Sequence, residues 1–348
     1  MSAPTCAPAL RIAAAGPGTT IQDSGRHGYL RFGVTVAGPM DALAHATANL
    51  AVGNPSGASA IEVGLGGLSL AAEDGPVTLA IAGAPFAVTL DGQKLETPLV
   101  LTLQPGAALS LRAGPTGAWC YVAAAGSFAL APVLGSTATH TRSGLGGLDG
   151  GPLKAGDRLP VGANAELSPT APARLIAPWL ERSRDVVRVV LGPQDDFFAR
   201  EVVERFLTQP WTLSGRSDRM GYLLEGEPLT HAGGFNIVSD GIAHGAIQVP
   251  GEGLPIVQMA DRAPTGGYPK IATVIGADLG SFAQLRPGAR FRFAAVDIAA
   301  AVAARRLQAE ALARPVERVP LIRTELPSDF LLGLNLVSGV VSATAPAG

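Results

Sequence analysis

The stretch from Ser239 to Arg286 reads SDGIAHGAIQVPGEGLPIVQMADRAPTGGYPKIATVIGADLGSFAQLR. Its centre, TGGYPK at residues 265–270, places two glycines before a tyrosine, a proline and a lysine. Paired glycines let a ligand or another strand approach the main chain, and Pro269 fixes its own backbone and holds Tyr268 extended. The stretch predicts either a site held by strand ends, with the Tyr268 hydroxyl and the Lys270 ammonium projected into it, or a tight hairpin with a solvated lysine.

On both sides of this stretch, short runs of Val, Ile, Leu and Thr alternate with turn residues. The 44 glycines and 28 prolines are high for a helical protein, and they fall between the runs. Such spacing is typical of β-barrels and β-sandwiches, so we expect a mainly β protein. The predicted strands lie at residues 77–83, 84–90, 99–106, 108–114, 118–126, 186–192, 270–276 and 289–296.

Three segments have the spacing and the end signals of helices. The first runs from about residue 41 to 52, with Asp41 as N-cap and Gly53 as its stop. The second covers about 196–208, where apolar pairs recur at helical spacing. The third begins near Asp297 and ends at Pro315, because proline cannot continue a helix.

A weak internal repeat indicates two similar halves. The motifs Gly-Pro, Arg-x-Gly-Tyr and Leu-x-Pro-Gly-Ala begin at residues 16, 26 and 103 and recur in the same order at 192, 219 and 285. A length of 348 residues also suits two domains, and the segment from Ser168 to Asp185 is the expected joint. We therefore predict domains at 1–175 and 176–300 and a helical and extended tail at 301–348, whose run LLGLNLVSGVV adds an edge strand or covers an interface.

Composition excludes several classes of partner. The formal net charge of -2 gives no electrostatic reason to expect nucleic acid or an anionic membrane. Two cysteines without a C-x-x-C pair indicate neither a disulfide framework nor a zinc knuckle and favour a cytoplasmic location. The N-terminus lacks the pattern of a signal peptide, and the apolar run at 330–343 is too short and interrupted to cross a bilayer.

Common catalytic motifs are missing from the sequence. It has no Gly-x-x-x-x-Gly-Lys-Ser/Thr loop, no complete G-x-G-x-x-G, no G-x-S-x-G and no H-E-x-x-H. The five histidines do not have metal-ligand spacing, so no metal site is predicted.

Two polar clusters remain, one in each half. In QDSGRHGY at 22–29, a bidentate pair of Asp23 and Arg26 is expected to stiffen a turn, with Tyr29 bonded across it; the alternative is a role in a site. In the second half, arginines suit anionic carboxylates, and Lys270 beside Arg262 suits a proton acceptor or a cation that stabilises an oxyanion. This second cluster also contains Arg219, Tyr222, Asp240, Gln248 and Asp261.

Five segments resemble the hallmark segments of the biotin-dependent carboxyltransferase family. They are QDSGRHGY (22–29), AGPMD (37–41), SDRMGY (217–222), SDGIAHGAIQVPG (239–251) and TGGYPKIATVI (265–275). That family includes allophanate hydrolase subunit 2, the C subunit of the ATP-dependent 5-oxoprolinase, KipA-type proteins and one half of the carboxyltransferase domain of urea carboxylase. The resemblance runs from about residue 10 to 295 and implies two cyclophilin-like β-barrel domains.

The resemblance implies three candidate functions. The first is a subunit of a complex that hydrolyses 5-oxo-L-proline to L-glutamate, with ATP used by the complex. The second is transfer of a carboxyl group from carboxybiotin on a partner to a urea-like or amide nitrogen. Biotin would arrive on another protein, because none of the four methionines here is followed by the lysine of a biotinylation motif. The third is a non-catalytic KipA-like regulator that binds a kinase inhibitor protein.

The implied partners are a second carboxyltransferase-like subunit, similar to the B subunit of 5-oxoprolinase or to allophanate hydrolase subunit 1, and a hydantoinase-like A subunit. The expected ligand is a small amide or lactam. His244 and Ala263-Pro264 depart from the residues usual in relatives, which affects the expected substrate preference. The residues expected to be catalytic are Lys270, Tyr268 and Asp261, and those expected to bind substrate are Arg262, Arg219, Tyr222, Asp240, Gln248, Gly266, Gly267, Asp23, Arg26 and Tyr29.

Overall fold

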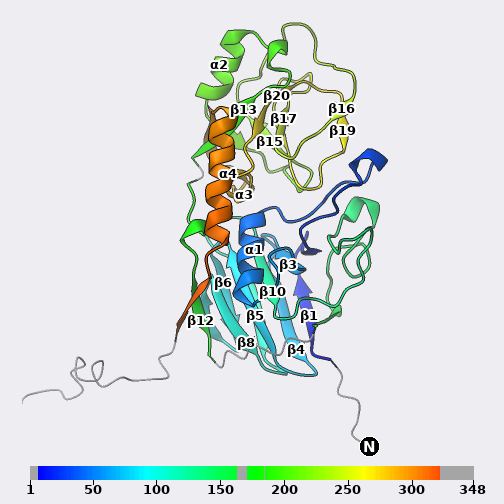
Figure 1. The fold of residues 1–348 in the computed structure, drawn as a ribbon, viewed down its shortest axis with the longest axis vertical. Helices are drawn as coiled ribbons and strands as arrows, with labels where there is room; N and C mark the ends of the chain where they lie inside the picture. The colour runs from blue at the N-terminus through cyan, green and yellow to red at the C-terminus, as the bar shows by residue number, and fades with distance from the viewer. Residues whose placement is uncertain (1–6, 163–170, 184, 322–348) are drawn as a thin grey trace, which may run out of the picture.

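The computed structural model describes residues 7–162, 171–183 and 185–321. Over these ranges the protein is mainly β, with four α-helices. Figure 1 shows the two halves stacked along the long axis, with two sheets in the lower half and a barrel in the upper half. No helix in the described ranges is both long and apolar enough to cross a membrane.

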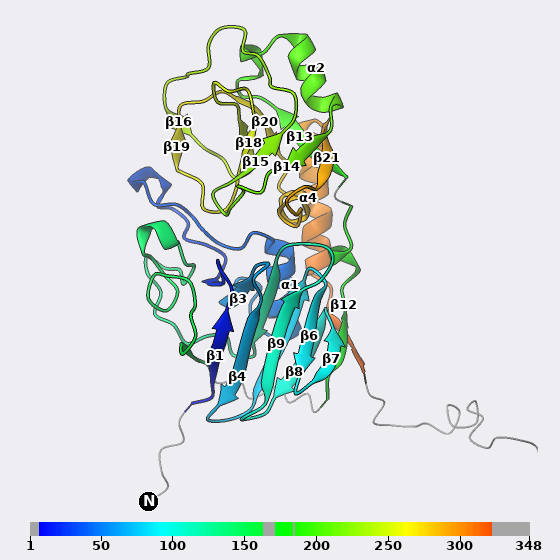
Figure 2. The same cartoon turned by 180° about the vertical axis from the view of Figure 1, so that it is seen from behind.

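The first half consists of two packed sheets. Strand β4 (Leu68–Glu73) alternates buried and half-buried residues, because successive side chains of a strand point to opposite faces. Strand β5 (Val77–Gly83) is buried almost throughout, since one face meets the other sheet and helix α1 (Ala42–Ala51) covers the second. Figure 1 shows α1 in front of this sheet, and Figure 2 shows the other sheet in front.

Both sheets of the first half are open at their edges. The six-stranded sheet has the order β11 (Arg158–Pro160), β1 (Ala9–Ala15), β4, β9 (Ala108–Ala113), β6 (Phe86–Leu90) and β7 (Gln93–Glu96). The seven-stranded sheet has the order β2 (Thr20–Gln22), β3 (Ala60–Val63), β10 (Cys120–Ala124), β5, β8 (Leu99–Leu103), β12 (Ala173–Ile176) and β22 (Glu317–Pro320).

The second half contains a closed seven-stranded barrel around an aromatic-rich core that includes Phe206, Trp211, Phe282 and Phe291. A two-stranded ribbon of β16 (Asp240–Gly241) and β19 (Thr265–Gly266) lies beside it. The barrel order is β13 (Val186–Leu191), β20 (Lys270–Val274), β17 (Ala246–Gln248), β18 (Ile256–Gln258), β15 (Gly221–Glu225), β14 (Trp211–Leu213) and β21 (Arg290–Ala295).

The fold prediction is confirmed in its coarse form and differs in detail. The protein is mainly β, but of the two expected barrels only the second half closes by hydrogen bonding within the described ranges. In the first half the strands divide between two sheets that meet face to face, so the edge strands do not pair to close a barrel. The cyclophilin-like character of each half and the domain boundaries stay predictions.

Two of the three helix predictions are confirmed at their N-caps. Asp41 accepts a hydrogen bond from Ala44 N at the start of α1, and Asp297 accepts one from Ala300 N at the start of α4 (Ile298–Leu312). Helix α2 (Arg200–Thr208) begins later than predicted, because Phe198 is extended and separates it from the 3-10 turn η4 (Asp195–Phe197). The short helix α3 (Leu279–Ala283) was not predicted.

After α4 the chain returns to the first half. Strand β22 pairs antiparallel with β12 and becomes the edge of the seven-stranded sheet. In Figure 1, α4 runs beside both halves, from the level of the barrel to the level of α1. The run LLGLNLVSGVV lies outside the described residues.

Candidate functional site

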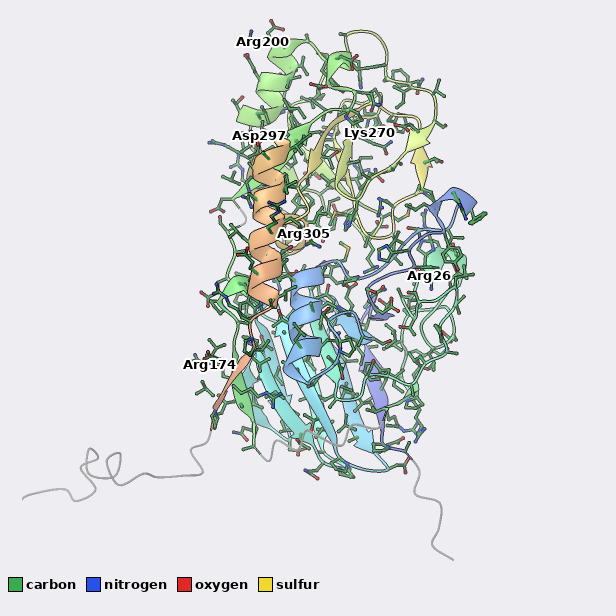
Figure 3. The ribbon with its side chains drawn as sticks, in the orientation of Figure 1. Arg26, Arg174, Arg200, Lys270, Asp297 and Arg305 are labelled. Atoms are coloured by element: carbon green, nitrogen blue, oxygen red, sulfur yellow. The ribbon has the colours of Figure 1, made fainter. Side chains whose placement is uncertain are left out.

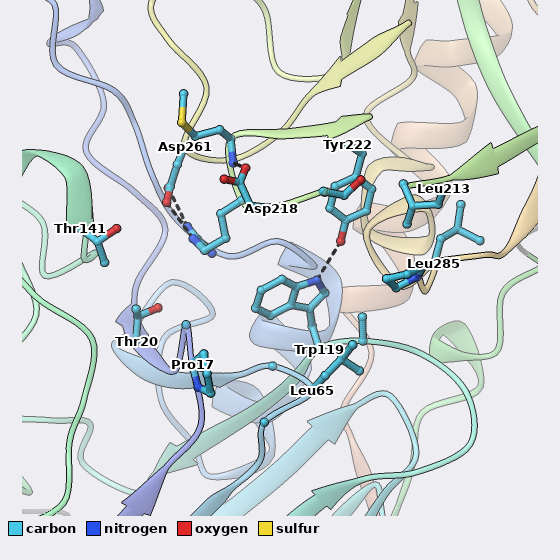
Figure 4. A pocket seen from close by; sticks show the side chains of 18 of the residues that line it. Pro17, Thr20, Leu65, Trp119, Thr141, Leu213, Asp218, Tyr222, Asp261 and Leu285 are labelled. Carbon is cyan, nitrogen blue, oxygen red and sulfur yellow. Dashed lines mark hydrogen bonds and ion pairs between the residues drawn. The ribbon is translucent and has the colours of Figure 1, made fainter. Parts of the chain in front are cut away.

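A cavity of about 700 Å³ lies between the two halves. Its walls are loops, turns and the ends of strands, so the sheets and the barrel hold them in place (Figure 4). The first half contributes Pro17, Gly18, Thr20, Gly64, Leu65, Gly66, Ala118, Trp119, Thr141 and Arg142, and the second half Leu213, Ser217, Asp218, Arg219, Met220, Tyr222, Asp261, Leu285 and Pro287.

Trp119 provides a fixed aromatic wall. Its Nε1 donates to the hydroxyl of Tyr222 at 3.1 Å, and that hydroxyl donates to Ala283 O at 2.7 Å (Figure 4). The backbone N–H of Trp119 donates to Oε1 of Gln284 at 2.9 Å. Burial raises the pKa of Tyr222 above its usual value, so the phenol stays protonated at neutral pH. These bonds orient the indole and join the two halves.

Arg219 binds acids from both halves. It forms a bidentate pair with Asp261, at 2.9 and 2.8 Å, and an ion pair with Glu62 of β3. A further hydrogen bond of 2.7 Å joins its Nη2 to Gly38 O. Burial lowers the pKa of Arg219, but the attraction of Glu62 and Asp261 outweighs burial and raises the pKa overall. The guanidinium is therefore charged and already fully engaged.

Glu62 is held by donors on the first half as well. Tyr121 donates its hydroxyl proton to Oε2 at 2.7 Å, and Met40 N donates to the same oxygen at 2.8 Å. The same Tyr121 hydroxyl accepts from Asp41 N, at the start of α1. Burial raises the pKa of Glu62, and the charge of Arg219 opposes that rise.

Arg142 is the exposed cation of the cavity. It lies on the 3-10 turn η2 (Thr141–Ser143), next to His140, whose Nδ1 lies 2.9 Å from Ser143 Oγ. Among the residues that the structure describes, Arg142 has no hydrogen-bonded or ionic partner. Asp218, on the opposite wall, accepts from Met220 N and so shapes the loop before β15. The cavity therefore has mainly apolar walls with one free guanidinium.

Three of the residues predicted from the sequence meet at this cavity: Arg219, Tyr222 and Asp261. Asp261, expected to be catalytic together with Lys270, binds Arg219 through its carboxylate instead. Lys270 is not part of the cavity wall. It lies in the barrel half (Figure 3), and its Nζ donates to Asp240 at 2.7 Å.

The other predicted residues of the second half surround the ribbon of β16 and β19. Gly266 lies in the ribbon with Gly267 beside it, and Tyr268 is exposed at 40%. Gln248 faces Lys270 across the β17–β20 ladder. Arg262 is buried, and its Nε donates to Ile242 O at 3.0 Å.

The expected bidentate pair of Asp23 and Arg26 is absent from the described ranges. Both side chains bind the segment at 133–138 and not each other. Asp23 accepts from Ser136 Oγ and Thr137 N, both at 2.6 Å, and Arg26 donates to backbone carbonyls of this segment. Asp23 and Arg26 lie three residues apart in a loop, and their side chains bind different atoms of the 133–138 segment, which is distant in the sequence. Tyr29 is half-buried and packs near Phe32, at 6.4 Å between ring centroids.

The residues missed at the site include Trp119, Arg142 and Gln284. Trp119 lies in the predicted strand at 118–126, and an aromatic residue in a strand is usually explained by packing in the core. Arg142 follows His140-Thr141 in a Gly-rich loop that has no motif. Gln284 binds Asp41, 243 residues earlier, and no local pattern signals such a contact.

Comparisons with known proteins identify the family of this chain. Residues 32–295 match the family "Carboxyltransferase domain, subdomain A and B". The chain is 39% identical over 300 residues to the 5-oxoprolinase C subunit of Escherichia coli, covering 86% of this chain and 95% of that protein. It is 37% identical to the 5-oxoprolinase C subunit of Haemophilus influenzae, over 82% of this chain and 91% of that one. The crystal structure of Kluyveromyces lactis urea carboxylase superposes with a TM-score of 0.81 and 29% identity, over 88% of this chain and 29% of that one.

Proposed function

This chain belongs to the family defined by carboxyltransferase subdomains A and B, and we propose that it is a subunit of an ATP-dependent 5-oxoprolinase that converts 5-oxo-L-proline to L-glutamate. The observation that carries the proposal is the 39% identity to a 5-oxoprolinase C subunit over 95% of that protein. Since nearly the whole relative is covered, the likeness extends beyond one shared domain to the complete subunit.

The cavity suits a small, flat lactam. Trp119 and Leu285 give apolar surface on which a five-membered ring can lie. At about 700 Å³ the cavity is much larger than such a ring. We infer that a segment of a partner protein enters the remaining space and completes the site.

ATP does not fit this cavity. A triphosphate needs several free cations or a nest of backbone N–H groups. Of the two arginines in the wall, Arg219 is neutralised by Glu62 and Asp261, and the carboxylate of Asp218 also lines the space. We therefore assign ATP to a partner, and we expect a cytoplasmic complex that also contains a chain like the B subunit of 5-oxoprolinase, together with a hydantoinase-like A subunit.

A second candidate is carboxyl transfer from a biotinylated partner. The observation in its favour is the superposition on urea carboxylase of Kluyveromyces lactis, with a TM-score of 0.81. The Trp119 face and the apolar wall around Leu65 would hold the ring system of biotin equally well. The KipA-like regulator stays a prediction.

The test is to purify the tagged chain with its partners from the native host and to assay glutamate release from 5-oxo-L-proline. We expect release only with ATP, and a loss of at least about tenfold in kcat/KM when Trp119 is changed to Ala. Copurification of a biotinylated protein, with no glutamate release, would reject the 5-oxoprolinase proposal in favour of carboxyl transfer.

A further inference from the structure

In the part of the chain that the structure describes, Arg262 is a buried cation with no carboxylate partner. Its residue is 6% exposed, and its Nε donates to Ile242 O. Among the described residues, no carboxylate forms an ion pair with it, and burial is the cause that lowers its pKa. A buried charge is costly unless it is paired, so this position needs an explanation.

Arg26 offers a contrast within the same protein. It is 1% exposed and also lacks an acidic partner in the described ranges, but it donates to the carbonyl oxygens of Val133, Ser136 and Ala138. Those carbonyls bind Nε and Nη2 of Arg26 as part of the structure, while its Nη1 is buried without a partner. Within the described ranges the Arg262 side chain binds a single carbonyl, that of Ile242, which leaves its other N–H groups available.

Two further polar groups near Arg262 lack partners. Gln248 is 5% exposed, and its Nε2 is buried without a hydrogen bond, as is Nε2 of His244. The charges of Arg262 and Arg219 both contribute to the lowered pKa of His244. Gln248 Nε2 and the Ile242 side chain lie 2.6 and 2.8 Å from where a Cβ on Gly266 would stand. Arg262 donates to the carbonyl of the same Ile242, and His244 follows Ile242 by two residues, so these groups lie near the ribbon of β16 and β19.

Lys270 lies in the same region but already has a counter-charge of its own. Lys270 lies directly opposite Gln248 in the β17–β20 ladder, and its ammonium, on a side chain that is 3% exposed, is paired with Asp240. One positive charge, that of Arg262, therefore remains without a counter-charge here. A single guanidinium matches a monoanion with two oxygens better than it matches a phosphate dianion.

We propose that Arg262, with the side chains of Gln248 and His244, forms a binding site for one carboxylate group, separate from the cavity between the halves. The guanidinium engages the carboxylate oxygens, and the Gln248 amide and the neutral His244 ring donate N–H bonds to it. None of these three residues lines the cavity. The cover is the two-residue strands β16 and β19, in which Asp240 and Thr265 are exposed, so the ligand enters when this ribbon shifts.

The first test uses the full-length chain and two ligands that differ by one carboxylate. Sodium acetate and acetamide are titrated by calorimetry, so the probes are carboxylate and amide without the lactam ring assigned to the cavity. We expect wild-type protein to bind acetate at least about tenfold more tightly, and Arg262→Gln to remove that difference. Arg290→Gln, an exposed position on β21, is the matched control and should keep it.

The second test does not depend on the proposed function. Sodium acetate is compared with sodium chloride at equal ionic strength, and we expect acetate to raise the Tm of the wild type but not of Arg262→Gln. Acetate stabilisation without 5-oxoprolinase activity in the complex would keep this site and reject the proposed function. Glutamate release by the complex, with no effect of acetate on the Tm of the wild type, would keep the proposed function and reject this site.

Three results would overturn the carboxylate site. One is equal affinity of the wild type for acetate and acetamide, which needs no variant and so holds even if Arg262→Gln fails to fold. Another is loss of the carboxylate preference in Arg142→Gln but not in Arg262→Gln, which would move the carboxylate into the cavity. The third is the absence of any effect of acetate on the wild type.

Discussion

Arg219 of the second half and Glu62 of the first half, 157 positions apart in the sequence, form a buried ion pair across the interface of the two halves. Asp261 binds the same guanidinium from the other side. The cavity is bounded by this cluster, so the contact that joins the halves also sets the shape of the candidate site. Assembly of the halves and formation of the site are therefore one event.

Arg219→Ala should destabilise the protein by about 3–5 kcal/mol, because it leaves two buried carboxylates without their cation. Urea unfolding followed by circular dichroism measures the change. Arg200→Ala is the control: its pair with Glu204 is exposed and lies within α2, so we expect about 0.5 kcal/mol or less. If Arg219→Ala lowers the free energy of unfolding by only about 0.5 kcal/mol, the interface between the halves does not depend on the pair of Arg219 and Glu62.

Asp23→Ala should destabilise the protein by about 1–3 kcal/mol, because the carboxylate accepts hydrogen bonds from Gly25 N, Ser136 Oγ and Thr137 N. Asp91→Ala is a comparison at an exposed turn, where the carboxylate accepts from Ala108 N. Equal stability of wild type and Asp23→Ala in urea, with loss of activity in the complex, would make Asp23 a site residue after all.

Lys270→Met should leave stability within about 1 kcal/mol, because methionine keeps the packing and Asp240, 54% exposed at its side chain, stays hydrated. Activity of the complex should fall at least about tenfold, since the lost ammonium borders the proposed carboxylate site. Thermal unfolding and the glutamate assay on one preparation separate the two effects. Full activity would remove Lys270 from the functional residues.

Cys120 should be inert in the folded protein. Burial raises the pKa of its thiol to about 12, so almost no thiolate forms at pH 8, and the side chain is fully enclosed. In a Cys6→Ser variant, a thiol reagent should label the protein only after guanidinium chloride is added. Labelling at native conditions would show that β10 opens readily.

His244 should make stability depend on pH in the acid range. Burial, with the charges of Arg262 and Arg219, lowers its pKa to about 3. The unfolded chain binds a proton at this residue below about pH 6.5 and the folded chain does not, so stability falls as the pH drops from about 6.5 toward 3, by up to about 1.4 kcal/mol per pH unit.

His244→Gln should remove that part of the slope, as measured by urea unfolding between about pH 4 and 6. His27→Gln, at an exposed position, is the control. An unchanged slope in His244→Gln would show that the ring is protonated in the folded protein or titrates as in the unfolded chain.

Local features of the fold could be predicted from the sequence. Asp41 and Asp297 cap α1 and α4 as expected, because a cap involves atoms only three residues away. The run at 77–83 coincides with β5, since its continuous apolar character suits a strand covered on both faces. Family membership was equally readable, because the hallmark segments are local strings of residues.

Pairings between distant segments were decided by the tertiary structure. Asp23 and Arg26 have the spacing of an ion pair, yet each binds the 133–138 segment, and Asp261 pairs with Arg219 and not with Lys270. The second half closes into a barrel because its edge strands pair, whereas the sheets of the first half stay open. The sequence of a single strand does not determine whether two edges pair. The sequence by itself determined the local elements and the residues available. The packing of the two halves decided which charged side chains meet, because the energy of a charge depends on its surroundings after burial.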